Sequence, residues 1–304
     1  MWTAHIGRSF RLFETLSSKS ISAGELARLT GLHKPAIEAW CSSAIAYQFL
    51  SRGSNGKLRL RAALAPILLD KSHPLYLGGQ ISYLAGRSLQ YGELEKLFKY
   101  GKLVSGRSSV RVVEEATHWD HYAFMKAVNA NRRLHNVMSD GAVFADIGCG
   151  TGSLIAKLHE KYPRSTFFGI DTSAKAVSIA KKALKGLPAK IVRMRAEDFR
   201  KNAEFDVVYL GESLYAASDK RMVISNCTRS LKVGGTLAIV EGLMPTRAAN
   251  ADDMIIMGMQ LDFALHGHKF MSKRELSSLL NVAGLIAIRF EPLGGAVFLV
   301  TARK

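Results

Sequence analysis

The pattern of apolar and polar positions divides the chain into two parts. From residue 143 onward, short apolar runs rich in β-branched residues alternate with helical repeats. Such runs predict strands at 143–147, 165–171, 189–194, 205–213, 231–242, near 285–290 and 296–301. Strands that alternate with helices favour a parallel sheet, and the last two runs form a hairpin pattern. We therefore predict an α/β fold with seven strands.

The N-terminal part has a different pattern. Apolar residues at helical spacing predict one amphipathic helix over 4–16. Ser22 with Glu25 three residues later forms a capping-box pattern for a second helix, and a third begins near Pro35. Asn55-Gly56 then marks the turn of a two-stranded hairpin. This order of elements predicts a winged helix-turn-helix within an N-terminal domain of residues 1–104.

A winged helix raises nucleic acid as a partner, and so does the net charge of +17. However, the third helix offers no Arg, Lys, Asn or Gln between Pro35 and Ala46 to reach base edges. The wing residues Lys57, Arg59 and Arg61 could contact phosphate only, without reading sequence. The positive charge is also spread over both parts of the chain, which is typical of a generally basic surface. We do not expect a nucleic-acid partner.

The strand at 143–147 ends in a glycine-rich turn. Asp146 is followed by Gly148, Gly150 and Gly152, and Ser153 begins a helix. Three residues without Cβ let the backbone bend sharply and approach a ligand at a helix N-terminus. The spacing G-C-G-T-G is one residue shorter than the dinucleotide pattern G-x-G-x-x-G. It resembles motif I of class I S-adenosylmethionine (AdoMet) methyltransferases, although an ordinary tight strand–helix turn could share it.

Two further acids follow the next strands. Asp171 lies 25 residues after Asp146, close to the spacing that places a carboxylate on ribose hydroxyls. Asp198 and Phe199 together suit an adenine, because one can accept from the exocyclic amine and the other can cover the base. The strand at 205–213 contains another small residue, Gly211. These positions predict a nucleoside site along one edge of the sheet.

The resemblance then extends over nearly the whole chain. The segments LARLTGL, YLGGQISYLAG, DIGCGTG, AEDF, LKVGGTLAIVE and FMSKRELSSLLNVAGL resemble small-molecule O-methyltransferases with an N-terminal winged-helix dimerisation domain. The resemblance implies a Rossmann-like methyltransferase sheet in residues 105–304, a homodimer, AdoMet as cofactor and S-adenosylhomocysteine as product. The residues expected to hold the cofactor are Asp146, Gly148, Gly150, Gly152, Asp171, Asp198, Phe199, Gly211 and Met125. The residues expected to line the acceptor site are Phe124, Tyr215, Met254, Met257 and Phe263.

The sequence departs from this family at the catalytic base. Its O-methylating members commonly carry a histidine where this chain has Tyr215, and a tyrosine hydroxyl ordinarily ionises near pH 10. Tyr215 could orient the substrate, or another histidine could act as base: His266 above all, or His268, His118 or His121. Alternatively, the acceptor needs no base, as with a carbon or nitrogen nucleophile.

Composition limits the remaining possibilities. No apolar run approaches the length of a membrane span, and the N-terminus lacks the pattern of a signal peptide, so we expect a cytoplasmic protein. Three cysteines at unrelated spacings predict neither a disulfide framework nor a metal site. The sequence thus favours an AdoMet-dependent methyltransferase of a small aromatic or polycyclic acceptor, most simply at oxygen, with C- or N-methylation as the alternative. A winged-helix nucleic-acid-binding regulator with AdoMet as ligand is the alternative from another class.

Overall fold

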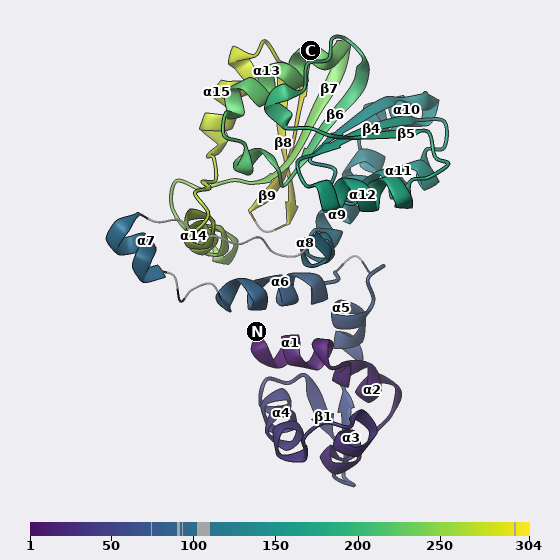
Figure 1. Ribbon diagram of the computed structural model, residues 1–304, viewed down its shortest axis with the longest axis vertical. Coiled ribbons are helices and arrows are strands. Elements are labelled where there is room, and N and C mark those ends of the chain that lie inside the picture. Colours follow the sequence, from purple (N-terminus) through teal and green to yellow (C-terminus); the bar gives the residue numbers. More distant parts are fainter. Residues whose placement is uncertain (74, 90–91, 93, 102–109, 295) are drawn as a thin grey trace. The chain divides into compact units, whose positions relative to one another are not determined.

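The computed structural model describes the chain except for residues 74, 90–91, 93, 102–109 and 295 (Figure 1). The chain forms two compact units, one of residues 1–92 with 107–119 and the other of residues 93–106 with 120–304. The boundary expected between residues 104 and 105 lies outside the described residues. None of the described helices is long and apolar enough to cross a membrane.

The first unit begins with four helices and a two-stranded hairpin. These elements are α1 (Trp2–Ser9), α2 (Leu12–Ser18), α3 (Ala23–Thr30), α4 (Lys34–Ala46), β1 (Leu50–Arg52) and β2 (Leu58–Leu60). The predicted capping box at the start of α3 is present, because Ser22 accepts from the Glu25 amide and Glu25 accepts from Ser22. Four helices precede the hairpin, where the sequence predicted three.

The prediction of one helix over 4–16 is wrong. The helix ends at Ser9, and a new one begins at Leu12, because Arg11 adopts a left-handed conformation with φ 57°. The break leaves Phe10 exposed and brings Leu12 and Phe13 fully into the core of the unit. A straight helix would have kept Phe10 and Phe13 on nearly the same face, and the break separates them.

The rest of the first unit consists of short helices. They are η1 (Ala62–Leu64), α5 (Ala65–Leu69), α6 (Gly78–Ser88) and α8 (Val110–Ala116). The Arg8 guanidinium binds the Leu68 carbonyl at 3.1 Å and the Tyr76 hydroxyl at 2.6 Å, and it pairs with Glu115 of α8 at 3.3 Å. These contacts attach α8 to the first unit, although the expected boundary at 104/105 assigns it to the second.

The second unit is built on the seven-stranded sheet. Its strands are β3 (Val143–Ile147), β4 (Thr166–Asp171), β5 (Ala189–Arg193), β6 (Phe205–Gly211), β7 (Leu231–Gly242), β8 (Ile286–Gly294) and β9 (Val297–Arg303). They lie in the order β5-β4-β3-β6-β7-β9-β8. The first five strands are parallel to one another. Strand β9 is antiparallel to both β7 and β8, so β8 runs in the same direction as the first five. The predicted α/β fold with seven strands is confirmed.

Helices cover both faces of this sheet (Figure 1). One face packs against α9 (His118–Ala130), α10 (Arg132–Gly141), α11 (Ser153–Lys161) and α12 (Ala174–Ala183). The other face packs against α13 (Lys220–Ser230) and α15 (Lys273–Val282). The remaining elements of the unit are α7 (Leu94–Tyr100), η3 (Ala196–Asp198), η4 (Leu214–Ala216) and α14 (Ala251–Ala264).

This topology fixes where a ligand can approach. The chain runs from β3 outward to β5 and then returns to β6 on the other side of β3, so the connections diverge between β3 and β6. In open parallel sheets, ligands bind at the carboxyl ends of the strands beside such a switch point. The glycine turn follows β3 and therefore lies at that position.

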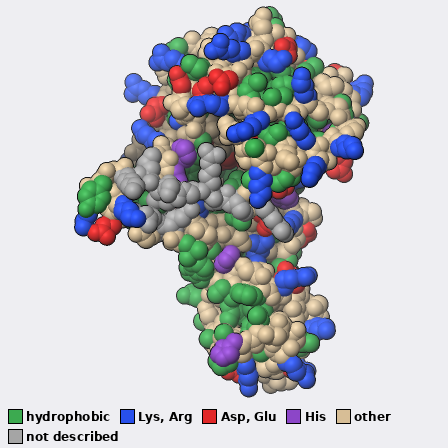
Figure 2. Space-filling model, viewed as in Figure 1, with side chains coloured by type: hydrophobic (Ala, Val, Ile, Leu, Met, Phe, Trp, Pro, Cys, Tyr) green, Lys and Arg blue, Asp and Glu red, His purple; other side chains and the backbone are tan. Residues whose placement is uncertain are grey.

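Lys and Arg side chains are spread over the visible surface among other side chains (Figure 2). They do not gather over one element in that view, which agrees with the generally basic surface expected from the sequence.

Candidate active site

The turn between β3 and α11 forms the centre of the site. Gly148, Gly150 and Gly152 all have positive φ, at 92°, 52° and 78°. A Cβ on Gly148 would lie 2.8 Å from Cβ of Ser213, and one on Gly152 would lie 2.7 Å from Cδ1 of Leu184. A Cβ on Gly150 would meet nothing within 4 Å. The outer two glycines are therefore required for close packing, and the middle one faces open space where a ligand could approach.

Asp171 holds this turn in place. Its Oδ2 accepts from the Gly150 amide at 3.0 Å, and its Oδ1 accepts from the Ser173 amide at 2.7 Å. The carboxylate is half-buried at the end of β4. Each carboxylate oxygen can accept more than one hydrogen bond, so Asp171 retains capacity for the hydroxyls of a ribose. The structure thus brings together two of the predicted cofactor positions, Gly150 and Asp171.

Asp146 lies beneath the turn rather than on it. The residue is 3 % exposed, and burial, reinforced by the nearby Asp171 carboxylate, raises the pKa of Asp146 to about 8. Cys149 is also buried, and burial raises the pKa of its thiol. Its sulfur packs against Gly169, where a Cβ would lie 2.9 Å away, so the size of Cys149 matters to the packing of the turn.

The two residues expected at the adenine lie differently. Asp198 is exposed at the end of η3, where it can meet a ligand. Phe199 is completely buried, and its ring packs against Phe168 and Phe205 with centroids 6.1 and 5.7 Å away. The expectation that the Phe199 ring covers the base is therefore not met in this conformation, because the apolar core under β4 and β6 takes up the ring.

Glu197 has a positioning role that sequence reasoning missed. It accepts from the Ser218 hydroxyl at 2.7 Å and the Ser218 amide at 3.0 Å, and it pairs with Arg195 at 3.5 Å. Burial alone would raise the pKa of Glu197, but these hydrogen bonds outweigh it and lower the pKa to about 2. The carboxylate thereby fixes the loop after β5 to the loop after β6. No local motif marks the contact, because the partners are 21 residues apart.

Tyr215 lies in a cluster of rings. Its ring centroid is 4.6 Å from Phe263, 5.5 Å from His268 and 6.2 Å from Phe270. Phe263 belongs to α14, whose Met254 and Met257 are 61 and 41 % exposed. Of the acceptor-lining residues expected from the sequence, the structure thus brings Tyr215 and Phe263 into contact.

Phe124 and Met125 lie on α9. Phe124 is completely buried, and its ring packs against Tyr209 at 4.3 Å. In this conformation it supports the site from the core and does not line it. Met125 is partly buried against the same core cluster. Gly211 leaves room for Tyr209, since a Cβ there would overlap the Tyr209 hydroxyl.

The other candidate bases are dispersed. His121 lies beside the start of α11, with Nδ1 3.4 Å from the Ser153 hydroxyl. His118 packs edge-on against Tyr76 in the first unit, with centroids 6.3 Å apart. His266 follows α14 in a turn, and its amide donates to the Phe263 carbonyl at 3.1 Å. The ring of His268 contacts that of Tyr215, as described above.

Three acids near the switch point, two of them buried and one partly buried, were also missed. Asp120 of α9, Glu212 after β6 and Glu241 near the end of β7 interact electrostatically in the core of the second unit. Glu212 and Glu241 could have been noticed in the sequence, since each follows an apolar run that predicts a strand. Only the fold brings them together.

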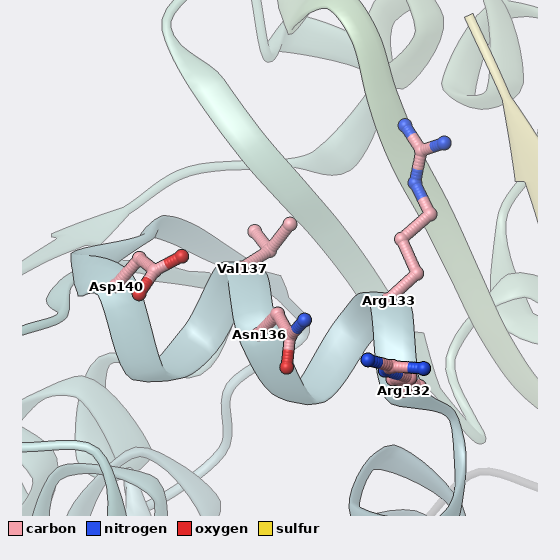
Figure 3. Close-up of a pocket in the computed structure, with 5 residues that line it drawn as sticks. All are labelled: Arg132, Arg133, Asn136, Val137 and Asp140. Atoms are coloured by element: carbon pink, nitrogen blue, oxygen red, sulfur yellow. The ribbon is translucent and has the colours of Figure 1, made fainter.

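A separate hollow on the second unit is lined by α10 (Figure 3). Its lining residues are Arg132, Arg133, Asn136, Val137 and Asp140. Arg133 donates to the Gly234 carbonyl at 2.7 Å, near the amino end of β7. The glycine turn lies at the opposite edge of the sheet, so this hollow is not the cofactor site.

Comparisons with known proteins agree with the geometry of the turn. Residues 144–235 match the model of a methyltransferase domain. The chain is 28 % identical over 127 residues to trans-aconitate 2-methyltransferase of Azoarcus sp., which covers 40 % of this chain and 49 % of that protein. The chain therefore spans about half the length of this curated relative.

Solved structures match nearly the whole chain. Human N-acetylserotonin methyltransferase in complex with SAM is 16 % identical, with a TM-score of 0.79 and coverage of 100 % of this chain and 93 % of that one. A structure described as a putative O-methyltransferase from Nostoc punctiforme is also 16 % identical, with a TM-score of 0.79 and coverage of 99 and 94 %. At these identities the likeness establishes the fold, including the part before the methyltransferase domain.

Proposed function

We propose that this protein is an AdoMet-dependent methyltransferase that acts on a small aromatic or polycyclic acceptor, with oxygen as the methylated atom. The observation that carries the proposal is the turn at 148–152, in which the open side of Gly150 lies beside the carboxylate of Asp171. The methyltransferase-domain match over residues 144–235 supports the same chemistry.

The described residues fit AdoMet along the strand ends. Asp171 would accept from the ribose hydroxyls, Asp198 would accept from the adenine amine, and the backbone at Gly148 and Gly150 would meet the amino-acid part. When bound, the cofactor supplies a methyl group on a positively charged sulfur, which a nucleophile attacks in line. Positioning and exclusion of water can supply much of the acceleration of such a transfer.

The ring cluster supports an aromatic acceptor. Tyr215, Phe263 and Phe270 present offset and edge-on faces to one another, an arrangement that also suits a planar ligand. Met259 lies beside this cluster, and methionine side chains adapt to irregular apolar shapes. We propose that Tyr215 orients the acceptor and that His268 or His266 takes its proton.

Calorimetric titration with S-adenosylhomocysteine tests the cofactor site. Activity is then tested by measuring the formation of S-adenosylhomocysteine from AdoMet in the presence of a library of phenols, amines and carbon nucleophiles. The wild-type protein should bind the nucleoside, and Asp171→Ala should lose that binding. Asp140→Ala is the matched control, because the Asp140 side chain is 82 % exposed and lies in the hollow beside α10. Binding of a pyridine dinucleotide in place of S-adenosylhomocysteine would contradict the proposal.

C- or N-methylation is the second candidate. Tyr215 stands where the family's O-methylating members commonly have a histidine, and a carbon or neutral amine nucleophile needs no strong base at this position. The library assay separates the two, since the bond formed in the product identifies the methylated atom.

We also propose that the protein is a homodimer through its N-terminal unit. Large apolar side chains are exposed on that unit: Trp2, Phe10, Leu75, Leu84 and Leu89. Exposed groups of this size are commonly buried between subunits. Sedimentation should show a dimer that is weakened by Leu89→Ser but not by Val233→Ser, whose side chain is also exposed but lies in the other unit. A monomeric wild-type protein at micromolar concentration would overturn this proposal.

A further inference from the structure

Two glutamates lie side by side at the carboxyl ends of β6 and β7. Gly211 and Val240 are partners in the parallel ladder, and the amide of the next residue, Glu212, donates to the Val240 carbonyl at 2.8 Å. Glu241 follows Val240 and is completely buried. Glu212 has φ 46°, a left-handed conformation that is unfavourable for a residue with a side chain. The fold therefore maintains this placement of Glu212 against its local preference.

A third acid and a phenol lie with this pair. Asp120 of α9 is 2 % exposed, and burial together with the Glu212 carboxyl raises its pKa well above the ordinary value. The Tyr209 hydroxyl is buried against Gly211, and burial reinforced by Asp120, Asp146 and the two glutamates raises its pKa. The site thus concentrates carboxyl and phenol oxygens, most of them buried, in the second unit.

Several of these polar atoms have no hydrogen-bond partner in the part of the chain that the structure describes. They are Oε1 of Glu212, both carboxyl oxygens of Glu241, and the Tyr209 hydroxyl oxygen. The amides of Leu214 and Tyr215 and the positive charge of Lys220 lie near Glu241 and oppose the rise in its pKa, which burial and Glu212 cause. Lys157 similarly attracts Asp120. Buried acceptors without partners are costly, and a ligand that donates to them would remove that cost.

The carboxyls are not arranged as a metal site. Among the described residues, no group of three or more His, Cys, Asp or Glu side chains is placed to hold a metal ion. A positively charged organic group suits such oxygens, because it places its positive charge and its polarised hydrogens beside them.

The position of the pair identifies which part of the proposed reaction it serves. Asp171 ends β4 and Asp198 follows β5, both on one side of β3. Glu212 and Glu241 lie at the ends of β6 and β7, on the other side. Glu212 precedes Tyr215 by three residues and Glu241 lies beside the amide of Tyr215. The pair is therefore at the acceptor end of the strand edge, away from the nucleoside positions.

We propose that Glu212 and Glu241, backed by Asp120 and the Tyr209 hydroxyl, form a subsite for a positively charged organic group beside the transferred methyl. This inference rests on the proposed function. The cation has two chemical sources: the sulfonium of the bound cofactor, or an ammonium group carried by the acceptor. In either case, a carboxylate next to the cation stabilises its charge in a low-dielectric site.

The first test compares ligands that differ in charge at the methyl position. Calorimetry measures the affinity of the full-length protein for S-adenosylhomocysteine, whose sulfur is neutral, and for sinefungin, which carries an amine in place of the sulfonium methyl. If the cofactor is the source, sinefungin should bind at least tenfold more tightly in the wild type, and Glu212→Gln and Glu241→Gln should each abolish most of this ratio while retaining S-adenosylhomocysteine binding.

The second test addresses the acceptor. With S-adenosylhomocysteine saturating, the protein is titrated with 2-phenylethylamine, which is a cation at neutral pH, and with 2-phenylethanol, its neutral counterpart. If the acceptor carries the cation, the wild type should bind the amine at least tenfold more tightly than the alcohol, and the two Gln variants should lose this difference in affinity. Glu204→Gln is the matched control, because Glu204 precedes β6, pairs with Lys201 at the surface and should leave both ratios unchanged.

The outcomes separate the two proposals. If the wild type binds S-adenosylhomocysteine but shows no preference for charge with either pair of ligands, the cation subsite is overturned and the methyltransferase proposal stands. If it binds no nucleoside at all, the methyltransferase proposal fails first. The two wild-type ratios decide the question even if a variant does not fold.

Discussion

Substitution of the middle glycine of the turn should separate ligand binding from stability. Gly150 and Gly186 both have left-handed φ, at 52° and 88°, and a Cβ added to either meets nothing within 4 Å. Gly150 lies in the turn after β3, whereas Gly186 lies between α12 and β5. Gly150→Ala and Gly186→Ala therefore impose the same kind of backbone strain, and only the first adds a methyl group where the cofactor would approach.

The expected magnitudes follow from this geometry. An alanine in the left-handed region costs roughly 1–2 kcal/mol, and the stiffer unfolded chain offsets about 0.4–1 kcal/mol of that. Each variant should thus lose about 1 kcal/mol of stability, or roughly 2–4 °C in Tm for a unit of this size. If the methyl group also prevents one backbone hydrogen bond to the charged part of the ligand, Gly150→Ala should lose a further 1.5–3 kcal/mol of binding, roughly ten- to hundredfold in Kd.

The assay is calorimetric titration with S-adenosylhomocysteine, with thermal unfolding of the same samples. The expected result is equal loss of Tm in the two variants and weakened binding in Gly150→Ala alone. Wild-type affinity in Gly150→Ala would refute the reasoning, because the open side of the turn would then not face the ligand. Equal loss of affinity in both variants would also refute it, since the effect would then arise from stability.

Three further predictions concern the side chains around the site. Tyr215→Phe removes the hydroxyl proposed to orient the acceptor but keeps the ring contacts with Phe263 and Phe270. The variant should therefore raise KM for the acceptor more than it lowers kcat. A hundredfold fall in kcat that is relieved at high pH would instead show that the hydroxyl acts as a base. Burial raises the pKa of Glu212 from 4.5 to about 7, so the folded state binds more protons than the unfolded state in that range, and Tm without ligand should fall as pH rises from 4.5 to 7. That fall should be smaller in Glu212→Gln, and an identical pH profile in the two proteins would contradict it. Hydrogen bonds outweigh burial to lower the pKa of Glu197 to about 2, so its stabilisation is present above pH 4.5 and is lost as pH falls through 2. Glu197→Gln should therefore cost about 1–2 kcal/mol at pH 7 and almost nothing near pH 2, as measured by denaturant titration at both pH values.

The amino-acid sequence alone determined the elements whose signals are local. The run at 143–147, the three glycines and the apolar spacing after Ser153 predicted a strand, a turn and a helix, and the structure has all three. The capping box at Ser22 and Glu25 was equally readable, since both partners lie within one helical turn. Periodicity and turn preferences depend on residues that are neighbours in the sequence, so they can be predicted without knowing the fold.

Tertiary structure decided which side chains face the site and which face the core. The ring of Phe199 is buried against Phe205, although its position after β5 predicted a contact with adenine. The helix expected over 4–16 is broken at Arg11, and Phe13 enters the core while Phe10 stays exposed. Asp120, Glu212 and Glu241 come from three separate elements, so no sequence pattern could have joined them. The burial of a carboxyl group and the electrostatic field around it depend on every element that packs against it. Those elements are brought together only when the helices pack on the sheet.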